Sequence, residues 1–483
     1  MDTKKLRQKV LDLAIHGKLV KQDPNDEPAS ILLDRIRAEK ARLVKEGKIK
    51  KSDLIEKPIS EDEIPFEVPE GWEWERWGNI SLSIQYGYNA PAEPSGDIKM
   101  VRITDIQNNK VLWDSVPFCK ISKEDIETYL LKPNDILFAR TGGTVGKSFL
   151  VNEVPEPSIY AGYLIRTRYS NSLNPKYMKY FMESELYWSQ LRDGTTSTAQ
   201  PNCNGKTLSK MILPLPPLAE QHRIVKAVDE LFEQIDIIER SEKELEEAAN
   251  KTRDKLLNLA IQGHLVPQDP NEEPASVLLE RIRAEKARLV KEGKLKKKDL
   301  EEKPISPDEI PFDIPEGWEW VRGGTAFLPM ESTKPSGDTF VYIDVDAVNN
   351  KRNIIDNAKT LSSAKAPSRA TRKLHCHDIL FSMVRPYLKN IAYVNEEYEN
   401  AIASTGFYVI TPTCGYYPEF LFHLMLTPYV INGLNQFMKG DNSPSINNSH
   451  IEQFLFPIPP LAEQRRIVEK IEEILSEIEK LHS

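Results

Sequence analysis

The sequence predicts an α+β fold in which two globular α/β domains are separated by a pair of long antiparallel helices, with pseudo-twofold symmetry and circularly permuted repeats. Three observations predict this fold. Two long stretches of the chain are near copies of each other, one long segment carries the apolar seam of a coiled coil, and the two chain ends together form a broken second copy of that segment.

The length and composition set the broad class. The chain has 483 residues, which is too long for one hydrophobic core and suggests about three structural units. Its 40% apolar and 28% charged residues are typical of a soluble folded protein. No apolar run is long enough to offer a membrane span, and the charged N-terminus lacks the apolar region of a signal peptide. We therefore expect a cytoplasmic protein with no membrane partner.

The repeat is the strongest internal signal. Residues 28–74, which begin PASILLDRIRAEK and end PEGWEW, return as residues 274–320 at an offset of 246, with 39 of 47 positions identical. A second repeat pairs LPLPPLAEQHRIV at 213–225 with FPIPPLAEQRRIV at 456–468, at an offset of 243. The segments between these landmarks match each other only in scattered places. We expect the near-identical parts to have the same function in both halves, and the divergent parts to have two different functions on the same structural framework.

After each PPLAEQ motif the apolar residues recur in alternating steps of four and three, which predicts a long helix with a coiled-coil seam. Burial of this seam against the chain's own domains is the alternative to a helix pair. The seam residues are Leu6, Val10 and Leu13 near the N-terminus, Ile224, Val228, Leu231, Ile235, Ile238, Leu245, Leu256 and Leu259 in the central helix, and Ile467, Ile471, Ile474 and Ile478 near the C-terminus.

The chain ends complete the second helix of the pair. At the repeat offsets Ser483 corresponds to position 240 and Met1 to position 247, so only six positions are missing from the broken copy. The first divergent segment leaves the end of the N-terminal helix and enters the start of the central helix, which requires the helices to run antiparallel. The expected organisation is an N-terminal helix at 1–20, a charged helical insertion at 21–69, a globular domain at 70–216, a central helix at 217–266, a second insertion at 267–315, a second globular domain at 316–459 and a C-terminal helix at 460–483.

The stretch RTGGTVGKS at 140–148 is close to a phosphate-binding loop but misses the pattern by one residue. The pattern needs Gly, four residues and then Gly-Lys-Ser/Thr, and Thr141 stands where the first glycine should be. The flanking segments NDILFAR and SFLVNEV both read as strands, whereas a phosphate loop leads into a helix. In the aligned copy, DILFSMVRPYLKN, the strand is kept and the loop changes. We therefore predict no nucleotide site here.

Two further features limit the chemistry of the chain. The four cysteines are scattered with no CxxC pair, which fits a reducing compartment and disfavours a zinc ribbon. His375, Cys376 and His377 form the one tight cluster of metal-ligand types, but neighbouring residues on a strand point to opposite faces. We therefore expect no metal in this chain.

The net charge of −9 by itself disfavours nucleic acid as a partner, but the charge is unevenly distributed. Residues 79–212 carry 15 basic and 13 acidic residues, whereas residues 218–258 carry 7 basic and 11 acidic residues. The excess acid therefore lies largely outside the first globular segment.

The ordered, duplicated set of motifs resembles the specificity subunit of type I restriction-modification systems. The motifs are PEGWEW at the start of each globular domain, DILFARTGGTVGKS and DILFSMVRPYLKN within them, QPNCNGKTLSK near the end of the first, and P-x-PPLAEQ-x-RIV before each helix. Each motif alone is weak, but the set covers essentially the whole chain.

The resemblance implies two target recognition domains, each reading one half of a split, gapped sequence in double-stranded DNA, with the helices as a spacer that fixes the gap. It also implies two modification methyltransferase subunits that bind S-adenosylmethionine and methylate adenine, and restriction/translocase subunits that use ATP. No methyltransferase motif of Asp or Asn, two prolines and an aromatic residue occurs in the sequence. We therefore expect a chain without catalysis or cofactor of its own.

The charged stretch around 31–63, duplicated at 277–309, departs from the simplest form of that layout. Within it, residues 35–51 and 281–297 each carry eight basic and two acidic residues. The default interpretation is an amphipathic helix with a solvated charged face. Docking of a modification subunit and contact with DNA phosphates are the alternatives, and docking is favoured because exact duplication fits two identical partners.

Candidate DNA-binding residues follow from residue type. Arg or Lys reads guanine and Asn or Gln reads adenine in the major groove, while Lys, Arg, Ser and Thr hold phosphates. Each candidate has a structural alternative, because polar runs often form self-satisfied turns and arginines often pair with carboxylates. In the first domain the candidates are Arg102, Thr104, Arg140, Thr141, Lys147, Thr195, Thr196, Gln200, Asn202, Asn204 and Lys206, and in the second they are Arg369, Arg372, Lys373, Arg385, Tyr387, Lys389, Ser443, Ser445, Asn447 and Asn448.

Trp72, Trp74, Trp318 and Trp320 are the same in both copies, so they cannot discriminate two half-sites and are assigned to packing at the domain entries. A coiled-coil scaffold that binds only protein is the competing hypothesis. It accounts for the helices and the acidic net charge, but not for two divergent domains in one frame.

Overall fold

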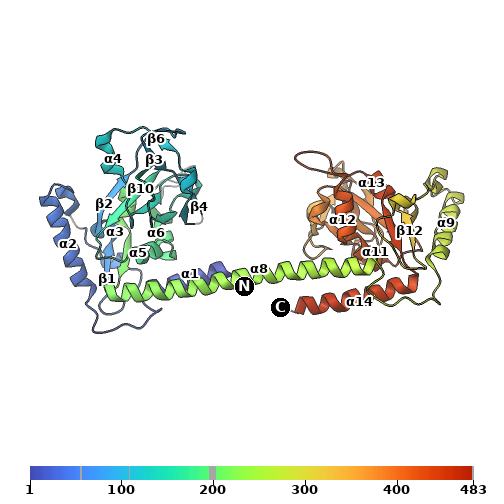
Figure 1. The fold of residues 1–483 in the computed structure, drawn as a ribbon, viewed down its shortest axis with the longest axis horizontal. Helices are drawn as coiled ribbons and strands as arrows, with labels where there is room; N and C mark the ends of the chain where they lie inside the picture. The colour runs from blue at the N-terminus through green and yellow to red at the C-terminus, as the bar shows by residue number, and fades with distance from the viewer. Residues whose placement is uncertain (55–56, 108, 195–202, 481–483) are drawn as a thin grey trace. The chain divides into compact units, whose positions relative to one another are not determined.

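The computed structural model describes the chain except residues 55–56, 108, 195–202 and 481–483. It divides into two compact units, Met1–Glu242 (unit 1) and Lys243–Ser483 (unit 2), which meet inside the central helix α8 (Leu218–Ile261). Each unit mixes helices with mainly antiparallel sheets, so the predicted α+β fold with two globular domains is confirmed (Figure 1).

The main sheet of unit 1 has four antiparallel strands in the order β2-β10-β7-β8. β7 lies in its interior, and Ile136, Leu137 and Phe138 are all buried, so the apolar run of the DILF motif faces packed atoms on both sides. The strands of this sheet are β2 (Ser81–Tyr86), β7 (Ile136–Ala139), β8 (Ser148–Leu150) and β10 (Leu164–Tyr169).

Unit 2 repeats this sheet in the order β13-β22-β19-β20. Each of β19, β20 and β22 lies 243 positions after its counterpart in unit 1, so the divergent segments keep the same frame. The strands are β13 (Phe327–Leu328), β19 (Ile379–Ser382), β20 (Ile391–Tyr393) and β22 (Phe407–Pro412).

A second, smaller sheet differs between the units. In unit 1 it has three strands in the order β6-β3-β9, and in unit 2 it has four in the order β17-β14-β21-β18. Its strands are β3 (Ile98–Val101), β6 (Phe118–Cys119) and β9 (Ser158–Tyr160), and β14 (Thr339–Ile343), β17 (Lys359–Ser362), β18 (Ala370–Lys373) and β21 (Ile402–Ser404). Two-stranded pairs complete the set: β1 (Glu73–Arg76) with β11 (Ile212–Leu215), β4 (Ile106–Gln107) with β5 (Lys110–Val111), β12 (Glu319–Arg322) with β23 (Leu455–Ile458), and β15 (Val348–Asn349) with β16 (Ile354–Ile355).

Helices flank these sheets in both units (Figure 1). In unit 1 they are α1 (Thr3–Ile15), α2 (Ala29–Lys45), α3 (Trp77–Ile80), α4 (Lys123–Tyr129), α5 (Pro175–Phe181), α6 (Glu185–Gly194), α7 (Gly205–Lys210) and the first part of α8. In unit 2 they are the rest of α8, α9 (Ala275–Lys291), α10 (Gly323–Ala326), α11 (Pro418–Met425), α12 (Pro428–Asn435), α13 (Asn448–Gln453) and α14 (Leu461–Lys480). Among the described residues, no helix combines the length and the apolar character that a membrane span requires.

The repeated PPLAEQ motif joins the start of a long helix to the domain entry. The Trp72 indole N–H donates to the Glu220 carboxylate at 2.9 Å, and the Trp318 indole N–H donates to Glu463 at the same distance. Both tryptophans and both carboxylates are buried, so the expected packing role of Trp72 and Trp318 is confirmed. The other two, Trp74 and Trp320, pack edge-on against Phe66 and Phe312.

Next to each buried glutamate, a glutamine closes the same junction. The Gln221 Oε1 atom accepts the Asn174 N–H at 2.9 Å, and the Gln464 Oε1 atom accepts the Tyr417 N–H at 2.7 Å. The Nε2 group of each glutamine donates to the carbonyl of the proline five residues earlier at 2.9 Å. Both copies of the motif therefore satisfy their buried polar atoms in the same way.

Within unit 1 the helix α1 runs antiparallel to the beginning of α8. The N-terminal amine of Met1 donates to Glu242 at 3.0 Å, and Arg7 donates to Asp236 at 2.5 Å while its guanidinium lies over the Phe232 ring. Residues further along α1 therefore meet residues nearer the start of α8, as the sequence predicts.

The apolar seam is buried in part. Val10, Ile224, Val228, Ile235, Leu256, Ile467 and Ile471 are buried, and Leu13, Ile238, Leu259, Ile474 and Ile478 are partly exposed. Three of the predicted seam residues, Leu6, Leu231 and Leu245, are instead 37%, 39% and 41% exposed. Leu245 lies beyond Glu242, the α8 residue that the N-terminal amine contacts, so α1 does not cover it.

The charged insertions fold onto their own units as a helix that turns back at Gly47 and at Gly293. Both glycines have φ near +70°, the left-handed conformation that ends a helix cheaply only at glycine. Lys40 is buried on the inner face of α2 and donates to the Asn79 carbonyl at 2.9 Å, and Lys286 on α9 donates to the Gly324 carbonyl at 2.6 Å. α2 and α9 are thus amphipathic helices with one buried face in both copies.

The chain returning from each insertion is held by an arginine of the first strand that follows. Arg76 donates to Glu63 at 2.6 Å, and Arg322 donates to both oxygens of Glu309 at 2.8 Å. The pKa of Glu309 is lowered to about 2, most by the hydrogen bond from the Ser306 N–H and next by Arg322. The pKa of Glu63 is also lowered to about 2, most by Arg76 and next by the Ser60 N–H.

The pH dependence of stability tests these two carboxylates. Their folded-state pKa lies below the ordinary value of 4.5, so their contribution is present above about pH 4.5 and is lost as the pH falls toward 2. We expect E63Q/E309Q to lower the urea midpoint of the full chain at pH 6 and to lower it by less at pH 3.5, where part of the contribution is already lost.

The matched control is D62N/D308N, which removes two carboxylates from the same turns. It should leave the difference between the two pH values as in the native chain. Equal losses for E63Q/E309Q at pH 6 and pH 3.5 would contradict the assignment.

Candidate nucleic-acid interface

The stretch RTGGTVGKS forms the connection of a β-hairpin. β7 ends at Ala139 and β8 begins at Ser148, and between them the chain makes a short 3-10 turn with Gly142 and Gly146 at positive φ. A Cβ atom on Gly146 would meet the Trp188 and Leu191 side chains, so the glycine is required by packing. The strand–loop–strand prediction is confirmed, and the helix that a phosphate loop needs does not follow.

In unit 1 this hairpin loop meets the segment that precedes α7. The Cys203 N–H donates to the Arg140 carbonyl at 2.9 Å, and the Gly205 N–H donates to the Tyr86 hydroxyl at 3.0 Å. The Arg140 guanidinium lies 4.8 Å from the centre of the Tyr86 ring. Two of the predicted stretches, which are about 60 residues apart in sequence, therefore form one corner.

Unit 2 builds the same corner from different residues. The Ile446 N–H donates to the Met383 carbonyl at 2.9 Å, which is the bond of Cys203 and Arg140 displaced by 243 positions. Val384 and Ser445 pair as an isolated β-bridge, and the Arg385 guanidinium donates to the Asn442 carbonyl at 2.6 Å. The predicted loops at 385–389 and 443–448 are thus also brought together.

The third predicted stretch in each unit, around 102–104 in unit 1 and 369–373 in unit 2, also borders this corner. The connection runs through the turn that joins the second sheet to the main sheet, between β9 and β10 in unit 1 and between β21 and β22 in unit 2. In unit 1, Val101 accepts the Ala161 N–H at 2.9 Å, and Tyr163 in the same turn accepts the Arg140 N–H at 3.2 Å. In unit 2, Arg369 accepts the Thr405 N–H at 2.9 Å, and Gly406 accepts the Met383 N–H at 2.9 Å. The three stretches therefore converge in both units.

The side chains of the unit 1 candidates divide into exposed and engaged groups. Thr104, Lys147, Asn204 and Lys206 are exposed, and Arg140 and Thr141 are partly buried. Arg102 instead donates from its Nε and Nη2 atoms to the buried Asp105 carboxylate at 3.0 and 2.8 Å, and Asp105 raises the pKa of Arg102. Asn204 caps α7 by accepting the Lys206 and Thr207 N–H groups. Thr195, Thr196, Gln200 and Asn202 lie outside the described residues.

Several unit 2 candidates are held by carboxylates. Lys389 donates to Asp254 of α8 at 3.1 Å, Arg369 to Asp344 at 3.0 Å, and Lys373 to Glu331 at 3.4 Å. Arg372 lies on β18 and is partly buried. Tyr387, Ser443 and Asn447 are exposed at the corner, Asn447 caps α13, and Ser445 and Asn448 are partly buried.

The loop between β19 and β20 is conformationally strained. Arg385 has φ of 48° and Lys389 has φ of 55°, both in the left-handed region. That region costs a side-chain-bearing residue roughly 1–2 kcal/mol. The Arg385 N–H, which donates to the Pro444 carbonyl at 2.8 Å, holds the strained residue against the neighbouring loop.

Two exposed aromatic residues at the unit 1 corner were not predicted. Tyr86 is 41% exposed and Tyr163 is 65% exposed. Exposed rings beside an arginine suit stacking on a base or packing against a sugar, because every base offers a π-face. The run YGYN, at 86–89 in the first divergent segment, was the signal available in the sequence.

No group of three or more His, Cys, Asp or Glu side chains within the described ranges is arranged to hold a metal ion. His375 lies between Glu331 and Glu399, and His377 contacts the Tyr393 hydroxyl. The two histidines of the predicted cluster therefore contact different side chains and do not face a common point. Burial raises the pKa of Cys203 to about 11, so this thiol stays protonated beneath the corner.

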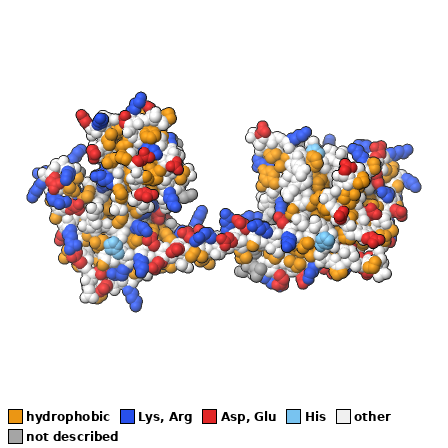
Figure 2. Space-filling model, viewed as in Figure 1, with side chains coloured by type: hydrophobic (Ala, Val, Ile, Leu, Met, Phe, Trp, Pro, Cys, Tyr) orange, Lys and Arg blue, Asp and Glu red, His pale blue; other side chains and the backbone are white. Residues whose placement is uncertain are grey.

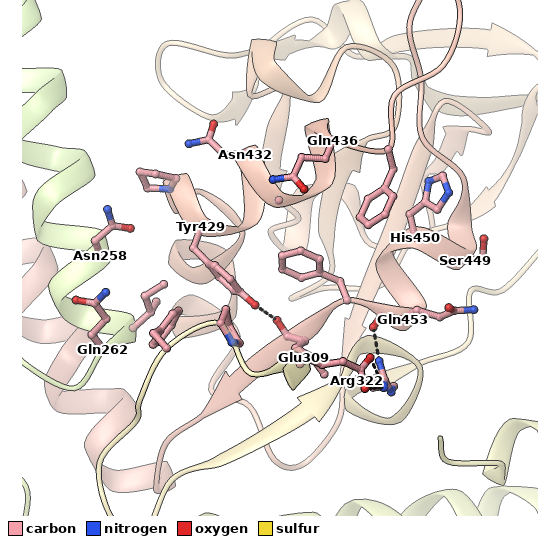
Figure 3. A pocket seen from close by; sticks show the side chains of 18 residues that line it. Asn258, Gln262, Glu309, Arg322, Tyr429, Asn432, Gln436, Ser449, His450 and Gln453 are labelled. Carbon is pink, nitrogen blue, oxygen red and sulfur yellow. Dashed lines mark hydrogen bonds and ion pairs between the residues drawn. The ribbon is translucent and has the colours of Figure 1, made fainter. Parts of the chain in front are cut away.

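A pocket of about 790 Å³ in unit 2 was also not predicted (Figure 3). Amide side chains line it from two helices, Asn258 at the end of α8 and Asn432 on α12 among them, while Arg322 is occupied by Glu309. Gly433 in its lining packs directly against the Phe454 ring, whereas the corresponding residue in unit 1 is Gln190, whose side chain binds both the N–H and the carbonyl of Ile212. Its lining presents no unpaired cation, so we assign it no part in the interface.

Comparison with known families places these observations in context. A family model described as the type I restriction modification DNA specificity domain matches residues 87–247 and 326–483. These two segments cover the candidate corners of both units and together exceed half of the chain.

Individual relatives agree with the family model. The type I restriction enzyme EcoAI specificity subunit of Escherichia coli is 30% identical over 549 aligned positions, covering 99% of this chain and 90% of the relative. The EcoEI specificity subunit of Escherichia coli is 33% identical, covering 79% of this chain and 73% of the relative. A solved chain, described under complex assembly and conformational transition of the type I R-M system, shares the fold with a TM-score of 0.58 at 20% identity, covering 86% of this chain and 93% of that chain.

Arg102 and Arg140 provide a matched pair of tests at the unit 1 corner. We expect R102A to lower the free energy of unfolding by about 1–3 kcal/mol, because it leaves the buried Asp105 carboxylate without its charged partner. R140A should change stability by less than that and should weaken binding of duplex DNA by the full chain. Urea unfolding and fluorescence anisotropy measure the two effects, and the opposite pattern would exchange the roles of the two arginines.

Proposed function

Because the chain belongs to the family of type I restriction-modification DNA specificity subunits, we propose that it reads a two-part, gapped DNA target with one half-site bound by each unit. The observation that carries this proposal is the pair of corners at 140–147 with 203–206 and at 383–389 with 439–448. They have the same backbone bonds at an offset of 243 but different side chains. Two sites with the same backbone arrangement but different side chains are suited to two half-sites of different base sequence.

The side chains at each corner suggest how each half-site is read. In unit 1, Arg140 suits guanine and Tyr86 offers a stacking surface, while Lys147 and Lys206 are exposed and suit phosphates. In unit 2, Arg385 and Asn447 are the candidates for base edges, and Tyr387 offers exposed aromatic surface. Arg102 and Lys389 are engaged by carboxylates and are given structural roles.

Methylation and cleavage are assigned to partner subunits. We infer that this chain positions two modification methyltransferase subunits, which hold S-adenosylmethionine, and restriction/translocase subunits, which use ATP. The α8 helix with α1 and α14 is the element suited to spacing the units, because the first turn of α8 and the first turn of α14 are each tied to a domain entry. The net charge of −9 predicts weak, salt-sensitive duplex binding by the isolated chain.

The competing function is a coiled-coil scaffold that binds protein without DNA specificity. The exposed Leu231 and Leu245 on α8 fit such a scaffold. A scaffold gives no reason for two divergent corners in one frame, so DNA recognition accounts for more of the chain.

The adenine methylome tests the proposal directly. In a methylation-free host, this chain with the methyltransferase encoded beside it should produce a gapped, two-part motif that disappears when the chain is omitted. Replacing residues 80–210 by another such domain should change one half of the motif and leave the gap unchanged. A methylome that does not respond to this chain, despite a stable complex with an active methyltransferase, would falsify the proposal in favour of the scaffold.

Arg385 tests the assignment of half-sites. We expect R385A to reduce discrimination at the second half-site by about 10- to 100-fold, because a well-placed arginine is worth roughly 1–3 kcal/mol against a wrong base. Methylation rates on duplexes with a substitution in either half-site measure the effect. K389A is the control, since Lys389 pairs with Asp254, and equal damage to both half-sites by R385A would contradict the assignment.

A further inference from the structure

The basic hooks, residues 35–51 and 281–297, hold a large share of the positive charge of the chain. Each contains eight basic and two acidic residues, a net charge of +6. Because the whole chain carries −9, the residues outside the two hooks carry −21. Figure 2 shows Lys and Arg side chains gathered over α2 and over α9. A concentrated positive charge of this kind is suited to a surface that meets an anionic partner.

The hooks are held rigidly on their own units. Ile36 and Lys40 are buried on the inner face of α2, and Ile282 and Lys286 are buried on α9 in the same way. The Lys40 and Lys286 amines donate to backbone carbonyls of the globular domain. The charges on the outer face therefore keep a fixed position relative to the corner of the same unit, so little ordering entropy is lost when a ligand binds.

The outer faces of the two hooks are the same. Over the 17 positions the copies differ once, where the partly buried Ile49 corresponds to Leu295. Folding requires only the buried positions to agree, yet the exposed ones are identical as well. The exposed basic ones are Arg35, Arg37, Arg42, Lys45, Lys48, Lys50 and Lys51, matched by Arg281, Arg283, Arg288, Lys291, Lys294, Lys296 and Lys297. The ligand of the hooks is therefore common to both units, unlike the ligands of the corners.

In unit 1 the hook forms one wall of a groove that leads toward the corner. The groove has a volume of about 920 Å³, with Lys48 and Lys50 on the hook side and the edge strand β2 on the other. Its lining includes Gln85, whose neighbour Tyr86 carries the Arg140 guanidinium on its ring. Arg168 in the groove floor is paired with Asp135, whereas Lys48 pairs with Glu46 of the hook itself, and Lys57 adds an exposed positive charge to the same lining.

We propose that the basic hooks bind the DNA phosphates that flank each half-site. The proposal rests on the DNA-recognition function above. Phosphates are the same at every sequence, so an identical surface serves two different half-sites, and lysine ammonium groups hold phosphates without reading bases. The groove places this surface next to the unit 1 corner. Docking of an acidic protein surface, which the sequence alone favoured, explains the duplication but not the continuity of the groove with the corner.

The test uses the full chain in complex with the modification subunits encoded beside it, and two 40-base-pair duplexes, one with the methylated motif and one without. The hook variant is K45Q/K51Q/K291Q/K297Q, which removes exposed lysines at equal positions of both copies. The charge-matched control is K5Q/K9Q/K226Q/K480Q, on exposed positions of α1, α8 and α14. A rescue variant carries arginine at the four hook positions.

We expect the hook variant to lower affinity for both duplexes by the same factor, about tenfold or more at low salt, and to reduce the slope of log affinity against log salt by up to about 3. The control should keep the native slope, the arginine variant should restore affinity, and the methylated motif should not change. Native affinity and slope in the hook variant would overturn the proposal, and so would a change in motif.

Light scattering on the same samples separates the protein-docking alternative. A hook variant that loses its modification subunits overturns the phosphate proposal and assigns the hooks to protein docking. Failure of the DNA-recognition function has a different signature, because the native complex itself would then show no preference for either duplex. Native preference for the motif together with an unaffected hook variant rejects the hook proposal alone.

Discussion

The buried hydrogen bond between a tryptophan at each domain entry and a glutamate in the first turn of each long helix is the constraint on which the rest of the fold depends. Glu220 and Glu463 are removed from water, and a carboxylate pays a high desolvation cost unless it is hydrogen-bonded. Their positions near helix N-termini and the indole N–H groups of Trp72 and Trp318 offset that cost. Gln22 and Gln268 donate to the same carboxylates at 2.9 and 2.8 Å, so replacing a tryptophan would leave the buried carboxylate with one donor fewer, and replacing a glutamate would leave the indole N–H and the glutamine without their acceptor.

With that junction fixed, the molecule separates its frame from its variable surfaces. The interior strands β7 and β19 lie at equal positions in the two units, and the same backbone bond joins the hairpin loop to the segment before α7 or α13. Side chains that point away from this frame can differ without disturbing it. The second sheet, which has three strands in unit 1 and four in unit 2, accommodates the difference.

The sequence predicted the frame well because repeats and apolar runs report buried contacts. The DILF strands, the hairpin at 140–148 and the entry tryptophans follow from such patterns. The side chains of the interface were harder to predict, since the partners of Arg102 and Lys389 are a nearby turn carboxylate and a residue of α8 far away in sequence. The exposure of Tyr86 could not be predicted, because the sequence alone does not distinguish an exposed tyrosine from one in the core. Leu245 follows the heptad pattern of α8 but lies beyond Glu242, where the contact with the N-terminus ends, so its periodicity did not report a buried position.

The left-handed residues on either side of Pro386 have a consequence for how specificity evolves in unit 2. Arg385 and Lys389 hold conformations that β-branched residues avoid, and proline fixes the backbone next to one of them. Substitution by a β-branched residue at these positions therefore loses loop geometry as well as side-chain chemistry, which narrows the set of side chains that single changes can reach. A new reading preference is reached more easily by exchanging the whole segment than by stepwise change. The rigid loop thus favours inheritance of recognition as a block, with intermediate sequences selected against for their folding before their binding is ever tested.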